Sequence, residues 1–469
     1  MNEKLNDFLN YIKGKRVALL GFGISNSSIV DFLLDAGVCL TVRDRKEDIA
    51  GREKYEARGV KFITGEAYLS GMDEDILFRS PGIRADMAEI AEAVSRGALL
   101  TGEMETFCAL FPGKIYAVTG SDGKTTTTTV IHKILSEEYR DTDRRIYLGG
   151  NIGFPLLAKI REAGEKDIAV LELSSFQLST MNFSPHAAVM TNITPNHLNW
   201  HRDMAEYIEC KKNIFSHMTG GRLVVNAANE ITRALENPRG ETVRFSSAGK
   251  PGGKSVYCEG REIFYSDGER KERIMSFDDI KLRGMHNVEN YMAAIAALYG
   301  EVSLDSILAV SRSFAGVKHR IELVSESGGI KYYNSSIDTS PTRSIAALVS
   351  FDEKLIVICG GYDKHIPIEP LIPVLADRAR AVFTTGQTGR EICEKLRAYT
   401  EDSVKKPKHI SYTERFDDAV KAAFSYAETG DTVILSPAAA SFDSFSNFEE
   451  RGERFRALVN EHISNKNEK

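Results

Sequence analysis

Short apolar runs alternate with helical periodicity in the first hundred residues. Runs at 16–21, 39–43 and 76–79 are apolar enough to form buried strands. Between the first two, a glycine turn leads into a stretch, 26–36, whose apolar residues recur at helical spacing. Strands that alternate with helices predict a parallel sheet. We therefore expect an α/β unit of about 100 residues at the start of the chain.

The same alternation continues in two further blocks. The middle block predicts strands at 114–119, 168–173, 187–193 and 222–225. A polar, glycine-rich stretch, 246–266, predicts loops or short antiparallel strands. The last block predicts strands at 354–359, 381–385 and 432–435, and helices at 341–350, 389–399 and 416–428. We expect three consecutive α/β domains, at 1–102, 103–316 and 317–469.

Length, composition and net charge limit the classes of protein to which the chain can belong. The 469 residues suffice for three domains of roughly 150 residues each. Hydrophobic residues make up 42% and charged residues 27%, which excludes a fibrous or a disordered chain. The net charge of −6 argues against nucleic acid as the main partner.

The sequence also favours a cytoplasmic location. No apolar run is long enough to span a membrane, and the first residues, MNEKLNDFLNYIKGK, contain no apolar core of a secretory signal. The six cysteines are widely spread and form no CxxC pair, so we expect reduced thiols in a protein core rather than disulfides or a zinc site.

The strongest motif is a phosphate loop between a strand and a helix. It reads Gly120-Ser121-Asp122-Gly123-Lys124-Thr125-Thr126. Glycines let backbone N–H groups approach phosphate oxygens, the lysine neutralises β- and γ-phosphate charge, and the Thr125 hydroxyl can hold Mg²⁺. The loop is shorter than the usual motif, because Val118 stands where a first glycine is expected. The alternative is a glycine turn that carries a surface lysine.

The turn after the first strand is a weaker nucleotide signal. It reads Gly21-Phe22-Gly23-Ile24-Ser25-Asn26 and lacks the third glycine of the dinucleotide fingerprint. Asp44 ends the next strand, where an acid can bind a ribose hydroxyl. The residues fit a Rossmann-like domain with a mononucleotide or nucleotide-sugar site. They fit a structural turn equally well, and a dehydrogenase less well.

Three polar residues of the middle block are ambiguous by themselves. Glu172 ends an apolar strand and is either a magnesium ligand or a satisfied buried acid. His197 follows a proline turn, and a lone histidine is more often structural. Lys211 belongs to a helix that the Asp203–Glu206 capping pattern begins. By spacing alone it belongs to a solvated helix face.

Together these motifs resemble the Mur ligases of peptidoglycan precursor synthesis, over almost the whole chain. Besides the phosphate loop, the matching runs are Gly149-Gly150-Asn151-Ile152-Gly153, Glu172-Leu173-Ser174-Ser175-Phe176-Gln177, Asn192-Ile193-Thr194-Pro195-Asn196-His197, Gly284-Met285-His286-Asn287 with Asn290, Lys318-His319-Arg320, and a long run from Leu435 to Gly452. The last run favours the members that add D-glutamate to UDP-N-acetylmuramoyl-L-alanine.

The resemblance implies a cytoplasmic, ATP-dependent ligase that forms an amide through an acyl phosphate. It implies three domains in order: a Rossmann-like domain for the UDP substrate, a central P-loop domain for ATP, and a Rossmann-like domain for the amino acid. It further implies two Mg²⁺ sites, small-molecule substrates only and a monomer. Because anionic groups must be brought together, catalysis would depend on positioning and on cations.

The resemblance also assigns roles residue by residue. Lys124 would stabilise the transferred phosphoryl group, and Lys211 matches the family's carbamylated lysine. The metal ligands would be Thr125, Glu172, His197 and the Lys211 carbamate. ATP would be bound by Gly120, Ser121, Asp122, Gly123, Lys124, Thr125, Thr126, Asn290 and Arg320. The UDP substrate would be bound by Gly23, Ile24, Ser25, Asp44, Arg45, Ser80, Gly82 and Asn151. D-Glutamate would be bound by Thr339, Lys364, Ser441 and Phe448.

The sequence departs from the family pattern after Asn334. Ser335 and Ile337 stand where many members carry aspartate and lysine, and Asp338 and Arg343 are candidates to replace their contacts. Asn196 precedes His197 where an aspartate is common. The alternatives are another Mur-type ligase, a folylpolyglutamate-type ligase, or a nucleotide-binding paralogue that has lost catalysis.

Overall fold

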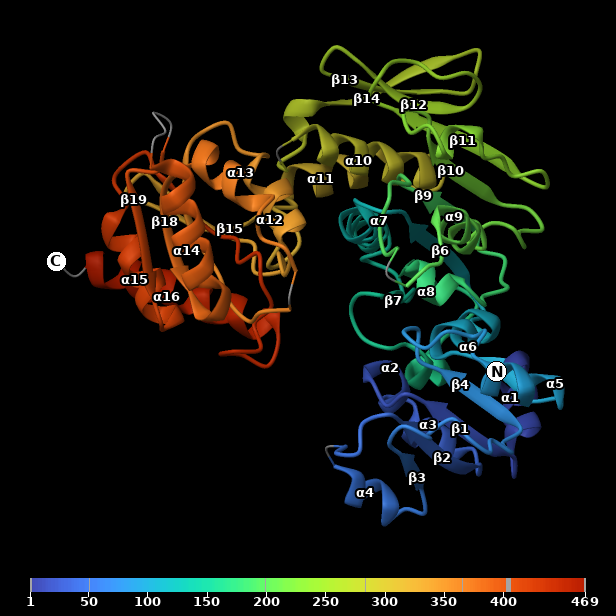
Figure 1. Cartoon of the computed structure of the whole chain (residues 1–469). Helices are drawn as coiled ribbons and strands as arrows, with labels where there is room; N and C mark the ends of the chain where they lie inside the picture. Colours follow the sequence, from blue (N-terminus) through green and yellow to red (C-terminus); the bar gives the residue numbers. More distant parts are fainter. Residues whose placement is uncertain are drawn as a thin grey trace. The chain divides into compact units, whose positions relative to one another are not determined.

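The computed structural model describes residues 2–49, 51–198, 200–282, 284–364, 366–401 and 406–467 (Figure 1). The chain divides into two compact units, residues 1–314 and 315–469, and each is described here by itself. In these ranges no helix is both long enough and apolar enough to cross a membrane.

The first unit begins with a five-stranded parallel sheet in the order β3-β2-β1-β4-β5. Its strands are β1 (Arg16–Leu20), β2 (Cys39–Asp44), β3 (Lys61–Thr64), β4 (Ile76–Arg79) and β5 (Leu99–Thr101). Its helices are α1 (Glu3–Ile12), α2 (Ile24–Ser27), α3 (Val30–Asp35), α4 (Arg52–Glu56), α5 (Ala88–Ser95) and α6 (Glu103–Leu110). The order matches half of a Rossmann fold, whose ligands bind where β1 lies between β2 and β4.

The same unit continues into a nine-stranded sheet in the order β14-β13-β12-β11-β10-β9-β6-β8-β7. Its parallel strands are β6 (Lys114–Thr119), β7 (Ile146–Gly150), β8 (Ile168–Glu172), β9 (Ala187–Met190), β10 (Arg222–Asn226), β11 (Glu241–Ser246) and β12 (Ser255–Glu259). Two antiparallel strands, β13 (Glu262–Ser266) and β14 (Lys271–Ser276), extend it; β13 lies in the stretch 246–266 where short antiparallel strands were predicted, and β14 lies beyond it.

Helices cover this larger sheet. The buried helices α7 (Lys124–Glu138) and α10 (Met285–Leu298) pack against each other and against the strands (Figure 1). α11 (Leu304–Ser313) packs on α7, while α8 (Ser175–Leu178) packs on α9 (Met204–Lys212). The phosphate loop therefore joins the central strand β6 to the buried helix α7.

The second unit is a six-stranded sheet in the order β15-β16-β20-β17-β18-β19, parallel except for β15. Its strands are β15 (Glu322–Ser327), β16 (Ile330–Asn334), β17 (Leu355–Cys359), β18 (Ala379–Thr385), β19 (His409–Thr413) and β20 (Thr432–Leu435). One core contains α12 (Pro341–Leu348), α13 (Leu371–Arg378) and α14 (Gly386–Thr400). The other contains α15 (Phe416–Tyr426) and α16 (Phe448–Asn467).

Two local expectations are corrected. The helix predicted over 26–36 is two short helices, α2 and α3, and the first begins at Ile24. Cys39 is exposed, whereas the other five cysteines are buried and free, so the prediction of core thiols is wrong for Cys39.

Candidate active site

The phosphate loop is held by the segment that follows β9. The Ser121 hydroxyl donates to the Thr194 carbonyl at 2.9 Å and accepts the Thr194 N–H at 2.9 Å. The Asp122 N–H donates to Asn192 Oδ1 at 2.9 Å, and the Thr191 hydroxyl donates to the Asp122 carbonyl at 2.6 Å. Because this segment fixes the loop on one side, the loop's shape does not depend on a ligand.

Two glycines of the loop allow close approach. A Cβ at Gly120 would lie 1.9 Å from Thr191 Oγ1, and one at Gly123 would lie 2.3 Å from Asn290 Oδ1. Gly123 caps α7 in the left-handed conformation, at φ +76. Asn290, which lies on α10, also accepts from Thr127 at 3.2 Å. The structure therefore brings the predicted ATP residue Asn290 against the loop.

Lys211 is buried, which corrects its interpretation as part of a solvated helix face. Its side chain is 2% exposed, and its Nζ donates to the carbonyl of Gly120 at 2.7 Å and to Thr119 Oγ1 at 3.3 Å. Burial, followed by the charge of Lys124, lowers its pKa well below the usual range. The Lys124 Nζ donates to the carbonyls of Gly120 and Ser121. The site thus holds two lysines beside one loop.

Glu172 ends β8 beside the phosphate loop and is 2% exposed. Its Oε1 accepts from Asn151 Nδ2 at 3.0 Å, and its backbone carbonyl accepts the Asn151 N–H at 2.7 Å. Its Oε2 is buried and finds no hydrogen-bond partner among the described residues. A buried carboxylate oxygen without a partner is costly, and Mg²⁺ prefers such oxygens. The residue therefore fits the predicted cation site.

His197 occupies an exposed loop after β9, with the unusual backbone angle φ +56. The centroid of its ring lies 5.0 Å from the ring centroid of Phe176, which belongs to α8. Across the described chain, no three His, Cys, Asp or Glu side chains gather as around a metal ion. The predicted ligand set contains only two such residues, Glu172 and His197, besides Thr125 and Lys211.

A second cluster lies where β1, β2 and β4 end. The Asp44 carboxylate accepts the N–H groups of Phe22 at 2.6 Å and of Lys46 at 2.7 Å, so it fixes the glycine turn. Asn26 is fully buried in the place of the missing third glycine. Its amide donates to the carbonyls of Leu20, Gly21 and Phe78 and to Ser80 Oγ.

The remaining predicted residues of this cluster lie around the same turn. The Ser80 hydroxyl donates to the Gly21 carbonyl at 3.0 Å, and the Gly82 carbonyl accepts from Trp200 Nε1 at 3.0 Å. Ile24 is 80% exposed, and Arg45 forms an exposed ion pair with Glu66. Gly23 has open space around its Cα, with no atom within 4 Å of an added Cβ. The turn therefore leaves room for a ligand at Gly23.

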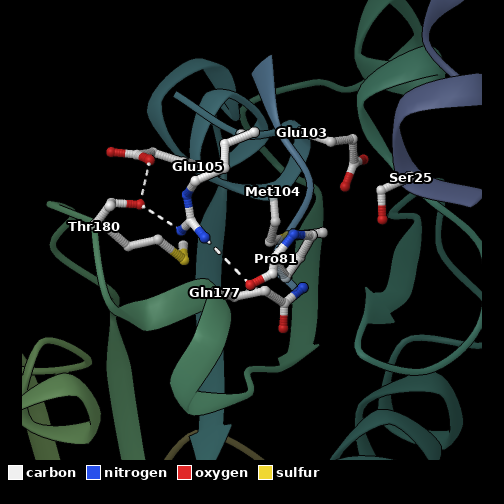
Figure 2. A pocket seen from close by; sticks show the side chains of 10 residues that line it. Ser25, Pro81, Glu103, Met104, Glu105, Gln177 and Thr180 are labelled. Atoms are coloured by element: carbon white, nitrogen blue, oxygen red, sulfur yellow. Dashed lines mark hydrogen bonds between the residues drawn. The ribbon is translucent and has the colours of Figure 1, made fainter. Parts of the chain in front are cut away.

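A cavity of about 320 Å³ lies between this cluster and α8 (Figure 2). Ser25 and Gln177 line it from different domains. The buried Arg79 donates to Thr180 Oγ1 at 3.1 Å, and the Thr180 hydroxyl donates to Glu105 at 3.2 Å. Burial raises the pKa of Glu105 to about 7. Arg79 thus ties the end of β4 to the segment that follows Glu172.

The second unit has its own cavity, of about 210 Å³. Thr339 and Lys364 line it, with Ala438, Ala439 and Ala440 from the loop after β20. Two other residues predicted to bind the amino acid, Ser441 and Phe448, occupy neighbouring segments and do not line this cavity. The structure therefore brings together two of the four.

Arg320 projects from a strained turn near the same sheet edge. His319 and Ile321 have φ +63 and +43, and a β-branched residue rarely adopts such an angle. The Ile321 N–H donates to Ser335 Oγ at 3.2 Å. Asp338 accepts from Ser436 at 2.9 Å, and burial raises its pKa to about 6.

Asp338 is one of the two residues predicted to replace the contacts of the aspartate that position 335 lacks. A hydrogen bond from the Ser335 hydroxyl, and the charges of Arg320 and Arg343, partly oppose the effect of burial on the Asp338 pKa. Asp338 therefore lies beside Ser335, whose backbone carbonyl accepts the Asp338 N–H at 2.9 Å.

Sequence reasoning missed three buried polar residues that organise these clusters. In the sequence, Asn26 is only a departure from a glycine pattern, and Arg79 is only the last residue of a predicted strand. Arg451 was noted only within a motif, yet it is 2% exposed and makes four hydrogen bonds. The sequence signal that could have found these residues is a polar side chain at the carboxyl end of a predicted strand or inside a family motif.

Comparisons with known proteins point to one family along the whole chain. Residues 15–102 match the family model described as Mur ligase MurD-like, N-terminal domain. Residues 118–298 match the Mur ligase middle domain, and residues 319–439 match the Mur ligase glutamate ligase domain. The chain is 47% identical to the UDP-N-acetylmuramoylalanine–D-glutamate ligase of Acetivibrio thermocellus, over 98% of this chain and 99% of that protein. It is 45% identical to the protein of the same name from Ruminiclostridium cellulolyticum, with the same coverage.

Solved structures agree on the fold. The UDP-N-acetylmuramate-alanine ligase MurC of Thermotoga maritima superposes with a TM-score of 0.58 at 20% identity, covering 96% of this chain and 100% of that one. The pseudomurein peptide ligase type C of Methanothermus fervidus superposes with a TM-score of 0.54 at 18% identity and the same coverage. The expected class, three consecutive α/β domains, is confirmed.

Proposed function

Because the chain belongs to the Mur ligase family, we propose that it joins D-glutamate to UDP-N-acetylmuramoyl-L-alanine at the expense of ATP. The observation that carries the proposal is the cluster at the ends of β6 and β8. There a fixed phosphate loop, a buried carboxylate with an unpaired oxygen, and a buried lysine meet. The relatives that match nearly the full chain bear the name of this activity.

The reaction has two steps. An oxygen of the alanyl carboxylate attacks the γ-phosphorus of ATP, and ADP leaves, which gives an acyl phosphate. The amine of D-glutamate then attacks the acyl carbon. The C–O bond breaks, phosphate leaves with the former carboxylate oxygen, and the amine loses a proton as the amide forms. Most of the barrier comes from bringing anions together, so positioned cations are the main requirement.

The central cluster supplies that positioning. Lys124 would neutralise the transferred phosphoryl group, and backbone N–H groups of 120–126 would bind the phosphates. Thr125, Glu172, His197 and Lys211 as a carbamate would hold Mg²⁺ at two sites. Bound Mg²⁺ offsets phosphate charge. Asn290 and Arg320 would complete the ATP site.

The surroundings of Lys211 support the carbamate. Burial lowers its pKa and so raises the fraction of neutral amine, which can add to CO₂ and release a proton. The product is an anionic oxygen ligand in place of a cation. This would account for a lysine in the centre of a metal site.

The substrate sites occupy the other sheet edges. Gly23, Ile24, Ser25, Asp44, Arg45, Ser80, Gly82 and Asn151 would bind the UDP substrate. Thr339, Lys364, Ser441 and Phe448 would bind D-glutamate, whose carboxylates suit a lysine and hydroxyl groups. We propose domain boundaries at 1–102, 103–316 and 317–469, and a cytoplasmic monomer without a nucleic-acid or membrane partner.

The test is phosphate release by the pure protein with Mg²⁺, ATP and UDP-N-acetylmuramoyl-L-alanine. D-Glutamate, L-glutamate, L-alanine and no amino acid are compared. Release with D-glutamate alone supports the proposal and means that Ser335 and Ile337 are tolerated. Release with another amino acid assigns a different ligase activity. No release from folded, ATP-binding protein assigns an inactive paralogue.

A further inference from the structure

Arg451 is a buried cation whose hydrogen bonds go to one hydroxyl and to backbone carbonyls. It lies on α16, and its side chain is 2% exposed. Its Nε donates to Ser336 Oγ at 3.0 Å, and its Nη2 donates to the Ser336 carbonyl at 2.9 Å. Its Nη1 donates to the carbonyls of Ala439 and Ala440 at 3.1 and 3.0 Å. Burial lowers the pKa of Arg451, and the charges of Asp443 and Asp338 partly oppose that effect.

These four hydrogen bonds join three segments. The first follows β16 and contains Ser336, three residues before Thr339. The second is the loop after β20, in which Ala439 and Ala440 precede Ser441. The third is α16 itself, which begins at Phe448. The Ser336 hydroxyl also donates to the Phe448 carbonyl at 2.8 Å.

A fourth segment joins through Ala440. The Tyr362 N–H donates to the Ala440 carbonyl at 2.9 Å, and Lys364 follows two residues later. A Cβ at Gly361 would lie 2.3 Å from the Ala440 oxygen and 3.1 Å from Arg451 Nη1. The guanidinium thus lies behind the walls of the second cavity, which Thr339 and Lys364 line.

The loop that Arg451 holds is strained. Ala438 has φ +58, a left-handed conformation that is unfavourable for any residue with a Cβ. Such a conformation persists only where neighbouring contacts determine it. The next two carbonyls, of Ala439 and Ala440, accept hydrogen bonds from the guanidinium. The strained residue and the two carbonyls that Arg451 holds are therefore consecutive in one loop.

We propose that Arg451 is the positioning residue of the amino-acid site: its planar guanidinium fixes the segments that carry Thr339, Ser441 and Phe448. The inference rests on the proposed function. A buried cation gives no net stability over an apolar side chain of the same size, so its presence requires another reason. The five donors of a guanidinium lie in one rigid plane and fix several acceptors in set directions, whereas the three donors of a lysine rotate.

The experiment compares Arg451→Lys and Arg451→Met with Arg454→Met in the full-length protein. Arg454 lies one turn along α16 and pairs with Asp417, so it is the matched control. We expect both Arg451 variants to raise the KM for D-glutamate at least about 10-fold, with the KM values for ATP and the UDP substrate within about 3-fold. Arg454→Met should leave all three unchanged.

Ser336→Ala keeps the proposal testable if the Arg451 variants fail to fold. It removes one acceptor of the guanidinium and leaves the three carbonyls, so we expect a smaller rise in the KM for D-glutamate alone. Equal changes for all substrates, or a lower melting temperature with unchanged KM values, would overturn the positioning role. If the unmodified protein releases no phosphate with D-glutamate, the proposed function fails before any variant is compared.

Discussion

Lys124 and Lys211 donate to the same oxygen, the carbonyl of Gly120, at 3.0 and 2.7 Å. Two ammonium groups around one carbonyl repel each other, and the effect is strongest for the buried one. Burial first, and the charge of Lys124 second, lower the pKa of Lys211. The relationship therefore separates the two lysines: Lys211 is the buried one, and its pKa is lowered.

Lys211→Ala should abolish activity, because it removes the amine that would carry the carbamate. Added bicarbonate should not restore turnover, whereas acetate or another short carboxylate should restore part of it by supplying an anionic oxygen. Lys211→Arg is the control, since it keeps a cation but cannot form the carbamate. Phosphate release measures the effect. Full activity of Lys211→Ala without any added carboxylate would contradict the carbamate hypothesis.

Lys124→Ala should lower kcat by at least about 10²-fold, the effect of losing one group that stabilises transition-state charge. Lys133→Ala serves as the control, because Lys133 is an exposed lysine on the same helix. Steady-state phosphate release with saturating substrates measures kcat for both. Near-normal turnover of Lys124→Ala would refute the phosphate-loop role.

Glu172→Gln should raise the Mg²⁺ concentration needed for half-maximal activity by at least about 10-fold. The amide can still accept from Asn151, but it replaces the buried, unpaired oxygen with a neutral group. A Mg²⁺ titration of phosphate release measures the change. Glu209→Gln, at an exposed position of α9, is the control and should titrate like the parent. An unchanged Mg²⁺ requirement in Glu172→Gln would exclude the residue as a ligand.

Glu105→Gln should remove a pH-dependent loss of stability. The folded-state pKa of Glu105 is about 7, above its ordinary value of 4.5, so the folded state binds more protons between these pH values. The free energy of unfolding therefore falls as the pH rises from about 4.5 to about 7, by about 3 kcal/mol for this group.

The melting temperature tests this prediction. Relative to the parent, that of Glu105→Gln should rise between pH 5 and pH 8. Glu165→Gln, an exposed substitution in the same unit, should show no such trend. A difference between Glu105→Gln and the parent that is the same at both pH values would contradict the prediction.

Central strands were predictable because they are apolar throughout. The strands β4, β6 and β20 begin and end where the sequence predicts, and each is buried along nearly its whole length. Outer strands such as β3 and β19 were missed, because their residues are partly exposed and carry few apolar side chains. The phosphate loop was predictable from its position between a strand and a helix.

The parts of the site that were not predictable depend on contacts between distant residues. Spacing on α9 suggested that Lys211 faces solvent, but Thr119 and Gly120, more than ninety positions away, bury it. Arg451 lies on a helix rich in charged residues, and its contacts with Ser336, Ala439 and Ala440 distinguish it from its neighbours. Local patterns contain no information on such contacts.

The central claim is that the reaction passes through an acyl phosphate. The most direct test follows one oxygen atom of the alanyl carboxylate. UDP-N-acetylmuramoyl-L-alanine is labelled with heavy oxygen in its alanyl carboxylate and incubated with Mg²⁺, ATP and D-glutamate. The released products are analysed by mass spectrometry. The account predicts one labelled oxygen in inorganic phosphate, ADP without label, and an amide product that retains the other. Label in AMP, or phosphate released without label, would contradict an acyl phosphate and with it the proposed role of the Lys124 loop.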